Sequence, residues 1–525
     1  MSVGTALSRL TGFLRLFAMA YALGVTESRL ADAFNVANTT PNMIYDLALG
    51  GILSSVFVPV FVERFERGDK ERAWHTARSV MTLAFIVLGA ITVLTMVGAR
   101  LIIDLYTLGV PAGGQREAER ALATFFLRWF MPQIIFYGLG AGVATGLLNA
   151  RRKFAAPMFA PIANNLIATA TFLAFALVPG ARHGTIDITT TQKYILAVGT
   201  TLGVVAMTAF LWPSLRKLDF RWRWVLDLKD AGLRRIGRLA GWAFAYAATN
   251  QVLLLIVIVL AGKVRGGYTA YASAYIFFQL PYAIFAVSIM TALLPSLSSR
   301  WSAGDVGTFR AQLTQGIRGT GFIVIPAAFG YIALAVPIVR VLLQHGVMGR
   351  QSTDLLAAVL QVFSIGLFPF CVFQVQMRAF YAMQDTRTPA VINFVATAIN
   401  TVADVVFVRF LKVEGLALGL ALAYAFAAIT AAIILRGRLG GPQDRRLWSS
   451  LARITLGGLL AGGAAYLVSF AVGRTLGTAS LGPEMLQVGA GVLAGVGAFL
   501  AVAIAFGMEE LILIRQMVLE RVRRR

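Results

Sequence analysis

Residues 414–435 read EGLALGLALAYAFAAITAAIIL, and Glu414 at the start is the only charged side chain among them. A helix needs about 20 apolar residues to cross the roughly 30 Å hydrocarbon core of a bilayer, so this stretch predicts a transmembrane helix. The whole chain has the same character, because 58% of its 525 residues are hydrophobic and 14% are charged. This composition is too apolar for one soluble core or for a protein that coats nucleic acid.

Further stretches of this kind predict an all-α integral membrane protein with 14 transmembrane helices. The first stretch lacks a small-residue cleavage site, so we expect it to remain in the protein as a helix and not to act as a signal peptide. The predicted spans lie near residues 4–23, 32–62, 79–104, 121–149, 157–179, 194–213, 239–262, 268–297, 319–343, 355–382, 389–408, 414–435, 451–472 and 485–507.

The distribution of basic residues predicts the orientation of these spans. The formal net charge is +23, from 47 Lys and Arg residues against 24 Asp and Glu residues. Of the basic residues, 29 lie in the C-terminal tail or in loops after even-numbered spans, and 11 lie in loops after odd-numbered spans. Because Lys and Arg accumulate on the cytoplasmic side, both termini should be cytoplasmic.

Two short patterns recur along the chain and predict an internal repeat. A proline followed nine residues later by Gly-Asp occurs at 59–69 and 295–305, and an alanine followed seven residues later by proline occurs at 150–157 and 382–389. Chance recurrence of common residues is the alternative. The predicted domains are an N-terminal six-helix bundle at 1–213, a C-terminal six-helix bundle at 239–435, two further helices at 451–507 and a basic cytoplasmic tail at 508–525.

Charged groups inside the first two predicted spans indicate a polar cavity, because a charge at the bilayer centre is costly unless it meets water or a partner. Arg9 and Arg15 lie in the first span, and Asp32 and Asn42 lie in the second. An arginine offers a planar fork of donors that matches phosphate oxygens, so these residues are candidates for binding a phosphate-bearing substrate. The alternative is an internal Arg–Asp pair that only joins the two spans.

Asn400 and Asp404 lie four residues apart in span 389–408 and therefore on one helix face. Their oxygens could bind a small coupling cation or relay a proton. A polar contact between helices is the alternative.

The sequence argues against several other kinds of structure and activity. Cys371 is the only cysteine, the three histidines are far apart, and no GxxxxGK[ST] loop occurs, which argues against a disulfide framework, zinc hydrolysis and ATP-driven pumping. Gly138, Gly142 and Gly146 have the spacing of close helix packing and follow no strand, so we reject a dinucleotide loop there.

The chain resembles a known family at several stretches. They are SRLTGFLR at 8–15, ADAF at 31–34, TPNM at 40–43, SSVFVPVF at 54–61, FQLP at 278–281 and TALLPSLS at 291–298. These resemble the MurJ/MviN lipid II flippases of the multidrug/oligosaccharidyl-lipid/polysaccharide exporter superfamily.

The resemblance implies a cavity between two six-helix bundles that accepts the diphosphate and sugar–peptide head of lipid II, with the helices at 451–507 forming a groove for the polyprenyl tail. Arg9, Arg15, Asp32 and Asn42 match residues of the family's cavity. Two departures stand out. Tyr45, followed by Asp46, occupies a position that is usually basic, and Ile276 occupies a position that is usually arginine. We therefore expect a weaker or rearranged head-group site, or one for a different lipid-linked glycan.

The resemblance also implies a sodium site of which Asn400 and Asp404 are two members. Val257 and Leu420 stand where this site has an aspartate and a threonine, which makes sodium coupling doubtful. No cofactor is expected, and membrane potential, a proton or sodium could supply the energy.

These observations predict a flippase of the bacterial plasma membrane that moves lipid II, or a related polyprenyl-diphosphate glycan, to the outer leaflet for cell-wall synthesis, with no covalent chemistry. The alternatives are a flippase for another lipid-linked oligosaccharide, a drug/cation antiporter of the same superfamily, and a membrane scaffold without transport activity. Expected partners are membrane lipids and cell-wall synthesis proteins, and no nucleic acid.

Overall fold

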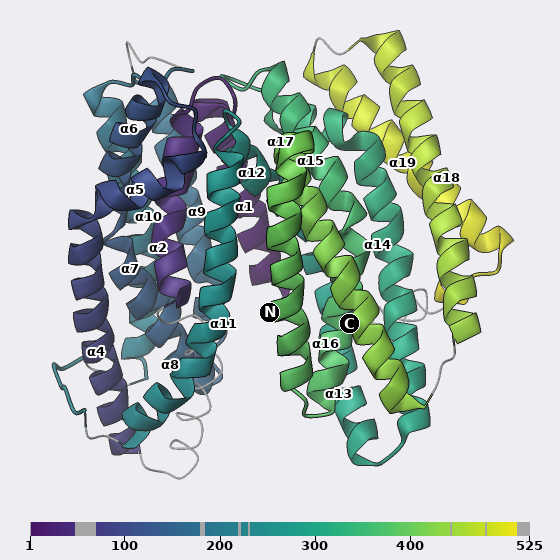
Figure 1. The fold of residues 1–525 in the computed structure, drawn as a ribbon, viewed down its shortest axis with the longest axis horizontal. Helices are drawn as coiled ribbons and strands as arrows, with labels where there is room; N and C mark the ends of the chain where they lie inside the picture. Colours follow the sequence, from purple (N-terminus) through teal and green to yellow (C-terminus); the bar gives the residue numbers. More distant parts are fainter. Residues whose placement is uncertain are drawn as a thin grey trace. The chain divides into compact units, whose positions relative to one another are not determined.

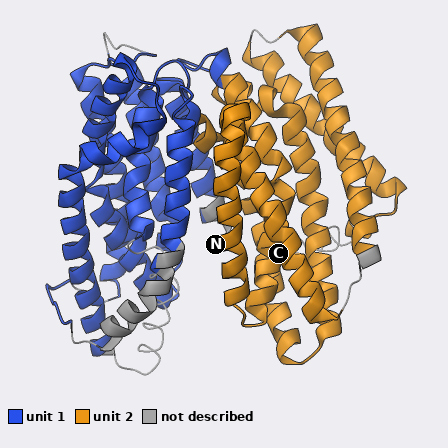
Figure 2. Cartoon of the chain, viewed as in Figure 1, with its two compact units in different colours: residues 1–269, 344–352 blue, residues 270–343, 353–525 orange. Residues whose placement is uncertain are grey.

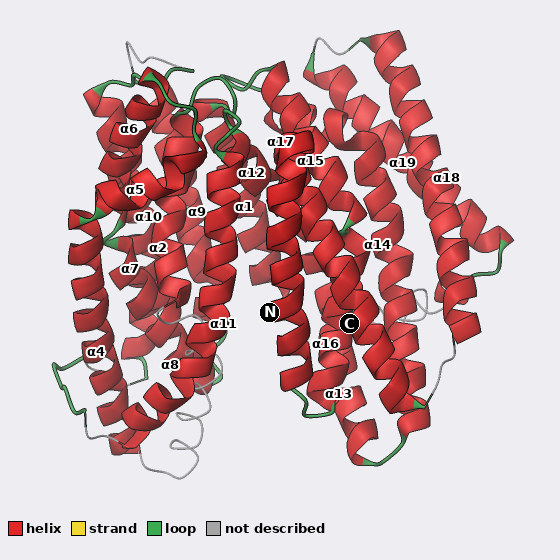
Figure 3. Cartoon of the chain, in the orientation of Figure 1, coloured by secondary structure: helices red, strands yellow, loops and turns green. Residues whose placement is uncertain are grey.

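The computed structural model describes residues 2–47, 70–178, 184–218, 222–228, 231–440, 444–477 and 480–511. Within these ranges the regular structure is helical and no strand occurs (Figure 3). Nine of the described helices are long and apolar enough to cross a membrane, and a bent helix pair brings the number to ten. The prediction of an all-α membrane protein is therefore confirmed, whereas the count of fourteen spans stays a prediction.

The chain forms two compact units (Figure 2). Unit 1 comprises Met1–Thr269 with Gln344–Ser352, and unit 2 comprises Ala270–Leu343 with Thr353–Arg525. The segment Gln344–Ser352 thus belongs to unit 1 although helices of unit 2 precede and follow it in the sequence. The predicted division into bundles at 1–213 and 239–435 stays a prediction.

Unit 1 is built from helices that follow one another closely in sequence (Figure 1). Helix α9 packs against both α1 and α10, and α2 packs against α6. The bounds are α1 Ser2–Leu23, α2 Leu30–Tyr45, α4 Lys70–Val97, α5 Ala99–Tyr106, η3 Thr107–Gly109, α6 Gly114–Phe130, α7 Gln133–Phe136, η4 Tyr137–Ala144, α8 Thr145–Ala150, α9 Ala155–Ala176, α10 Thr190–Arg216 and α11 Ala231–Ala261, and α12, Gly267–Pro281, begins in this unit.

The helix predicted at 121–149 is interrupted twice. Elements α6, α7, η4 and α8 together form one apolar run from Gly114 to Ala150. The first interruption lies at Met131 and Pro132, because proline has no backbone N–H to continue the helical ladder. The second is η4, a π-helical stretch with a wider turn than an α-helix. Such π turns often occur at functional positions.

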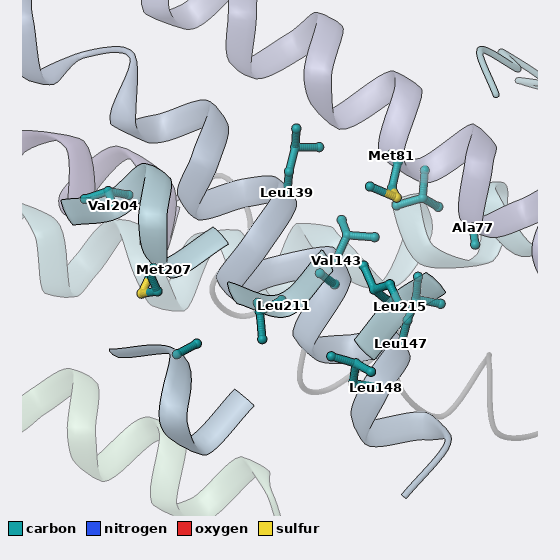
Figure 4. Close-up of a cluster of buried hydrophobic side chains, with 13 residues drawn as sticks. Ala77, Met81, Leu139, Val143, Leu147, Leu148, Val204, Met207, Leu211 and Leu215 are labelled. Atoms are coloured by element: carbon teal, nitrogen blue, oxygen red, sulfur yellow. The ribbon is translucent and has the colours of Figure 1, made fainter. Parts of the chain in front are cut away.

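A cluster of buried apolar side chains holds η4 in place (Figure 4). Its members come from α4, η4, α8, α9 and α10, and they bury a continuous apolar face that favours this packing by the hydrophobic effect. The cluster therefore positions Tyr137, the first residue of η4. The labelled members are Ala77, Met81, Leu139, Val143, Leu147, Leu148, Val204, Met207, Leu211 and Leu215.

Unit 2 holds the remaining helices. Helices α18 and α19 pack against each other and against α14. The bounds are η5 Tyr282–Ala286, α13 Val287–Ser302, α14 Val306–Leu343, α15 Arg350–Ile365, α16 Leu367–Ala382, α17 Arg387–Leu439, α18 Asp444–Leu476 and α19 Leu481–Ala505, with α12 entering from unit 1 and α15 beginning there. The α15–α16 pair bends by 46° at Gly366.

Helix α17 is two helices joined at a sharp break. It contains 53 residues, and Lys412 within it has φ 51° and ψ −127°, which is not a helical conformation. A continuous helix of this length would measure about 80 Å, more than twice the hydrocarbon thickness. The break lies between the spans predicted at 389–408 and 414–435.

The helix predicted at 268–297 changes from an α-helix to a π-helix where α12 ends. Pro281 cannot donate to the carbonyl of Phe277 four residues earlier, because proline lacks an N–H. The hydroxyl of Tyr331 on α14 donates to that carbonyl instead, at 3.1 Å. The π-helical η5 follows directly at 282–286. Residues 46 and 47, which lie 236 positions before 282 and 283, are also π-helical.

Some sequence features lie outside the described residues. They are the stretch 54–61 that carries part of the family resemblance, the Gly-Asp pair of the first repeat at 68–69, and residues 512–525 of the basic tail.

Candidate functional site

Arg9 and Arg15 both lie on α1, and six residues separate them, so they point about 120° apart around the helix axis. The Arg9 side chain is exposed, whereas Arg15 is half-buried. The titratable group that interacts with the Arg15 guanidinium is the hydroxyl of Tyr137 on η4. The structure thus gives the two arginines different surroundings.

Arg15 belongs to a group of polar and aromatic side chains that we call the Arg15 cluster: Arg15, Asn42, Tyr45 and Tyr137. The Tyr137 hydroxyl lies near the Arg15 guanidinium and the Asn42 side chain, and the Asn42 amide donates to the carbonyl of Asn38 at 3.2 Å. The rings of Tyr45 and Tyr137 are 5.9 Å apart, with an angle of 36° between them. Helices α1 and α2 and the π turn η4 therefore meet at one set of hydrogen-bond donors.

Sequence reasoning missed Tyr137. The spacing of the glycines that follow it predicts close helix packing, and no sequence pattern identifies the π turn in which the tyrosine lies. In the sequence, Tyr45 indicates only a missing positive charge, whereas the structure places its ring against Tyr137. Asp46, the next residue, is exposed.

Asp32 is buried, and its hydrogen-bond partners lie outside the Arg15 cluster. Its carboxylate accepts hydrogen bonds from the backbone N–H of Gly266 at 2.8 Å and from the N–H and hydroxyl of Thr269 at 3.0 and 2.8 Å. These donors lie at the start of α12, so Asp32 ties α2 to that turn. Ten residues separate Asp32 from Asn42, which places them about 15 Å apart along α2.

A polar network surrounds Asp32 at the same end of α2. Arg29 pairs with Glu119 of α6 at 3.1 Å and donates to the carbonyl of Gly262 at 3.2 Å, and both side chains are buried. Glu27 accepts from the Gly349 N–H at 2.7 Å and from the Ser352 hydroxyl. Sequence reasoning did not single out these residues, because each partner is distant in the sequence.

Asn400 and Asp404 lie together in the first half of α17, and both are buried, with 1% and 0% of their surface exposed. Among the described residues, the side-chain nitrogen and oxygens of this pair have no hydrogen-bond partner. A Cβ added at Gly419, in the second half of α17, would clash with an Asp404 carboxylate oxygen. The second half of α17 therefore packs closely against the Asp404 carboxylate at Gly419, a residue without a side chain.

Buried polar atoms are hydrogen-bonded in most proteins, and unpartnered ones need an explanation such as an unseen water, ion or bound proton. The pair offers an amide oxygen and a carboxylate, which suit a hard cation. Leu420, beside Gly419, adds no side-chain oxygen. Across the described part of the chain, no group of three or more His, Cys, Asp or Glu residues could hold a metal ion.

A family model described as Lipid II flippase MurJ matches residues 19–486. The chain belongs to the lipid II flippase MurJ family. Asn42, Tyr137 and Asp404 fall inside the matched residues, whereas Arg9 and Arg15 precede them.

MurJ proteins of several bacteria are similar along most of the chain. A probable lipid II flippase MurJ of Rhizobium meliloti (strain 1021) is 26% identical over 514 residues, which cover 97% of this chain and 94% of the relative. A lipid II flippase MurJ of Burkholderia cenocepacia is 28% identical over 424 residues, covering 79% and 78%. The chain therefore matches 94% and 78% of the length of these two relatives.

Solved structures share the fold. A lipid II flippase MurJ in an inward closed conformation has a TM-score of 0.77 at 22% identity and covers 96% of this chain and 98% of its own. An inward-facing multidrug resistance transporter of the MATE family has a TM-score of 0.67 at 17% identity, covering 83% and 98%. This MurJ-family chain is accordingly a multi-pass protein of the bacterial inner membrane with a transporter fold.

Proposed function

We propose that this MurJ-family chain flips lipid II from the cytoplasmic to the outer leaflet by alternating access. The observation that carries the proposal is the Arg15 cluster, a half-buried guanidinium near the Tyr137 hydroxyl, with Asn42 and the ring of Tyr45 next to that tyrosine. A charge in that position is retained when it has a functional partner, and the diphosphate of a lipid-linked substrate supplies one. Membership of the MurJ family supports lipid II as the substrate.

The donors of the cluster fit a diphosphate. Arg15 offers the planar fork of donors that binds phosphate oxygens. Tyr45 and Tyr137 add hydroxyl donors, and Asn42 adds an amide donor. In this proposal the two tyrosines partly replace the basic groups that the family usually carries. Arg9, which is exposed on another side of α1, approaches the substrate from outside the cluster, and Asp32 supports the site by fixing α2.

We propose the Asn400–Asp404 pair as the coupling site. A buried carboxylate without a partner is costly when ionised, so it favours an arriving cation or a proton. Two side chains supply fewer oxygens than a sodium ion usually takes, which favours a proton or a site completed by backbone carbonyls. The membrane potential can act on either charge, since moving one elementary charge is worth about 2.3 kcal/mol per 100 mV.

We also propose fourteen spans in a six, six and two arrangement with both termini in the cytoplasm. The break at Lys412 supports two spans within α17. The π turns at 46–47 and 282–286 support the repeat, because they share its offset of 236 residues. The interruptions at Pro132 and Gly366 lie within two residues of the second offset, 232.

The substrate is tested in cells depleted of their own flippase and supplied with this protein. Outer-leaflet lipid II is measured by its cleavage with an externally added hydrolase. We expect exposure to be restored, Arg15→Ala to abolish it, and Arg128→Ala, which removes an exposed arginine of α6, to leave it unchanged. No exposure with a correctly inserted protein contradicts the substrate, and full activity of Arg15→Ala contradicts the anchor role.

The coupling ion is tested separately in vesicles that hold the purified protein. Flipping is followed while the sodium gradient, the pH gradient and the membrane potential are imposed one at a time. We expect a pH gradient to drive flipping in the parent protein and not in Asp404→Asn. Flipping that is driven only by the sodium gradient would contradict coupling to a proton.

A second candidate is a flippase for another lipid-linked oligosaccharide, which the Tyr45 and Ile276 departures favour. A glycan that competes with lipid II in the vesicle assay more strongly than lipid II itself supports that reading. Binding of cell-wall synthesis proteins stays a further expectation.

A further inference from the structure

A groove runs between the two halves of α17, at the end that the charge distribution predicts to be cytoplasmic. Its volume is about 530 Å³. Apolar side chains form its walls, and polar and charged side chains gather at its mouth. The lining residues are Asp385, Arg387, Thr388, Val391, Ile392, Val395, Phe426, Thr430, Ile434 and Arg438.

The mouth of the α17 groove is held by one ordered ion pair. Arg438 pairs with Asp385 at 2.6 Å and donates to the Thr388 hydroxyl at 2.9 Å. The Asp385 carboxylate also accepts from the backbone N–H groups of Arg387 and Thr388, at 3.0 and 2.9 Å. The Arg438 guanidinium lies 5.4 Å from the centroid of the Phe380 ring, in a cation–π arrangement. The mouth is therefore preorganised.

A positive charge remains after this pairing. Arg387 is exposed, and its guanidinium forms no ion pair with the described residues. Nearby, Arg310 of α14 donates to the carbonyls of Leu439 and Gly440 at the end of α17. Asp385 pairs with Arg438 and leaves the charge of Arg387 in excess at the rim.

The walls face an apolar medium. Val391 and Val395 expose 55% and 39% of their surface, and the neighbouring Phe394 exposes 61%. Apolar side chains exposed on a membrane-spanning helix contact lipid chains. The α17 groove thus combines an apolar channel in the hydrocarbon region with a cationic rim at the predicted cytoplasmic surface.

We propose that the α17 groove binds one anionic phospholipid of the cytoplasmic leaflet. The acyl chain lies along Val391, Val395 and Ile434, and Arg387 contacts the phosphate, while the Asp385–Arg438 pair keeps the rim open in a fixed geometry. Basic clusters at the cytoplasmic ends of membrane helices attract anionic lipids. A soluble anion would leave the apolar walls without a partner, so the geometry favours a lipid.

The test uses the full-length protein in detergent with equal amounts of phosphatidylglycerol and phosphatidylcholine, and native mass spectrometry counts the lipids that stay bound. We expect one tightly held phosphatidylglycerol on the parent protein. Arg387→Gln should lower the preference for phosphatidylglycerol about fivefold, the factor expected for one basic residue at a membrane surface. Arg223→Gln, at another exposed cytoplasmic arginine, should not change it.

A second variant tests the channel. Val391→Trp places a large ring in the α17 groove on a lipid-facing position, so we expect it to release the bound lipid without unfolding the protein, as thermal melting will verify. Equal binding of both lipids by the parent protein, or unchanged preference in Arg387→Gln, contradicts the proposal. Lipid II that displaces phosphatidylglycerol from the parent protein, and that no longer binds to Val391→Trp, would assign the groove to the transported lipid instead.

Discussion

Two buried aspartates, one in each unit, show how different the two regions of the molecule are. Asp32 in unit 1 is 2% exposed and accepts three hydrogen bonds, from Gly266 and Thr269. Asp404 in unit 2 is 0% exposed and has no hydrogen-bond partner among the described residues. Burial alone therefore does not indicate function. The distinguishing feature is whether the protein itself satisfies the carboxylate, which makes Asp32 a structural anchor and Asp404 a candidate for binding an ion or a proton.

The largest effect is expected at Asp32. Asp32→Ala leaves the amides of Gly266 and Thr269 buried without an acceptor, which should cost about 3 kcal/mol or more of unfolding free energy. Thermal melting of the purified protein measures this, with Asp187→Ala, at an exposed aspartate, as the control. A melting temperature equal to the parent's would show that Asp32 is no anchor.

Asp404 should respond in the opposite way. Asp404→Asn removes a buried charge that has no described partner, so the melting temperature should stay unchanged or rise. Flipping in vesicles should fall at least about tenfold, equivalent to about 1.4 kcal/mol in the rate-limiting step. If the variant instead loses stability as Asp32→Ala does, Asp404 has a structural partner and the comparison between the two aspartates fails.

The carbonyl of Phe277 offers an intermediate case, a buried acceptor freed by Pro281 and satisfied by the Tyr331 hydroxyl. Tyr331→Phe should cost about 1 kcal/mol of stability. In a Pro281→Ala background the carbonyl regains a backbone N–H, so the same substitution should cost almost nothing. Melting of the parent, both single variants and the double variant forms a double-mutant cycle, and strictly additive effects would contradict the link.

The smallest effect is expected at Asp385, a partnered aspartate at the surface. Partial burial acts to raise its pKa, but hydrogen bonds from Thr388 and the charge of Arg438 outweigh this and lower the pKa to about 2. A lowered pKa stabilises the fold above the unfolded value of about 3.9, and this contribution is lost as the pH falls through 2. Because Arg438 is 40% exposed, solvent screening should limit it to about 1 kcal/mol.

The measurement compares the melting of the parent and Asp385→Asn between pH 6 and pH 3. The difference should be largest at pH 6 and shrink below pH 4. A difference that is independent of pH would mean that Asp385 acts through packing and not through its charge.

The sequence predicted the features that depend on local periodicity. The apolar runs predicted the helices, and the charged residues Lys412 and Glu414 between two such runs agree with the break inside α17. The spacing of Asn400 and Asp404 placed them on one face, and the structure buries both. Helical geometry alone carries such information.

Features that depend on distant contacts could not be predicted. The partners of Asp32 lie more than 230 residues away in the chain, at Gly266 and Thr269. Tyr137, which lies near Arg15, is the first residue of a π turn, and no residue pattern marks a π turn. Sequence reasoning therefore found Arg15 and Asn42 but not the tyrosine that lies between them.

The π turn η4 has a consequence for how this chain tolerates changes in length. A π turn accommodates one residue more than an α turn, so it is the usual trace of a single insertion into a helix. Deleting one residue between 138 and 143 should convert η4 to an α-helix and leave Leu147 and Leu148 on the same buried face. The same deletion in the regular helix α9 would rotate every later side chain by about 100°. Transmembrane segments of this protein therefore differ in the length variation that evolution can allow them.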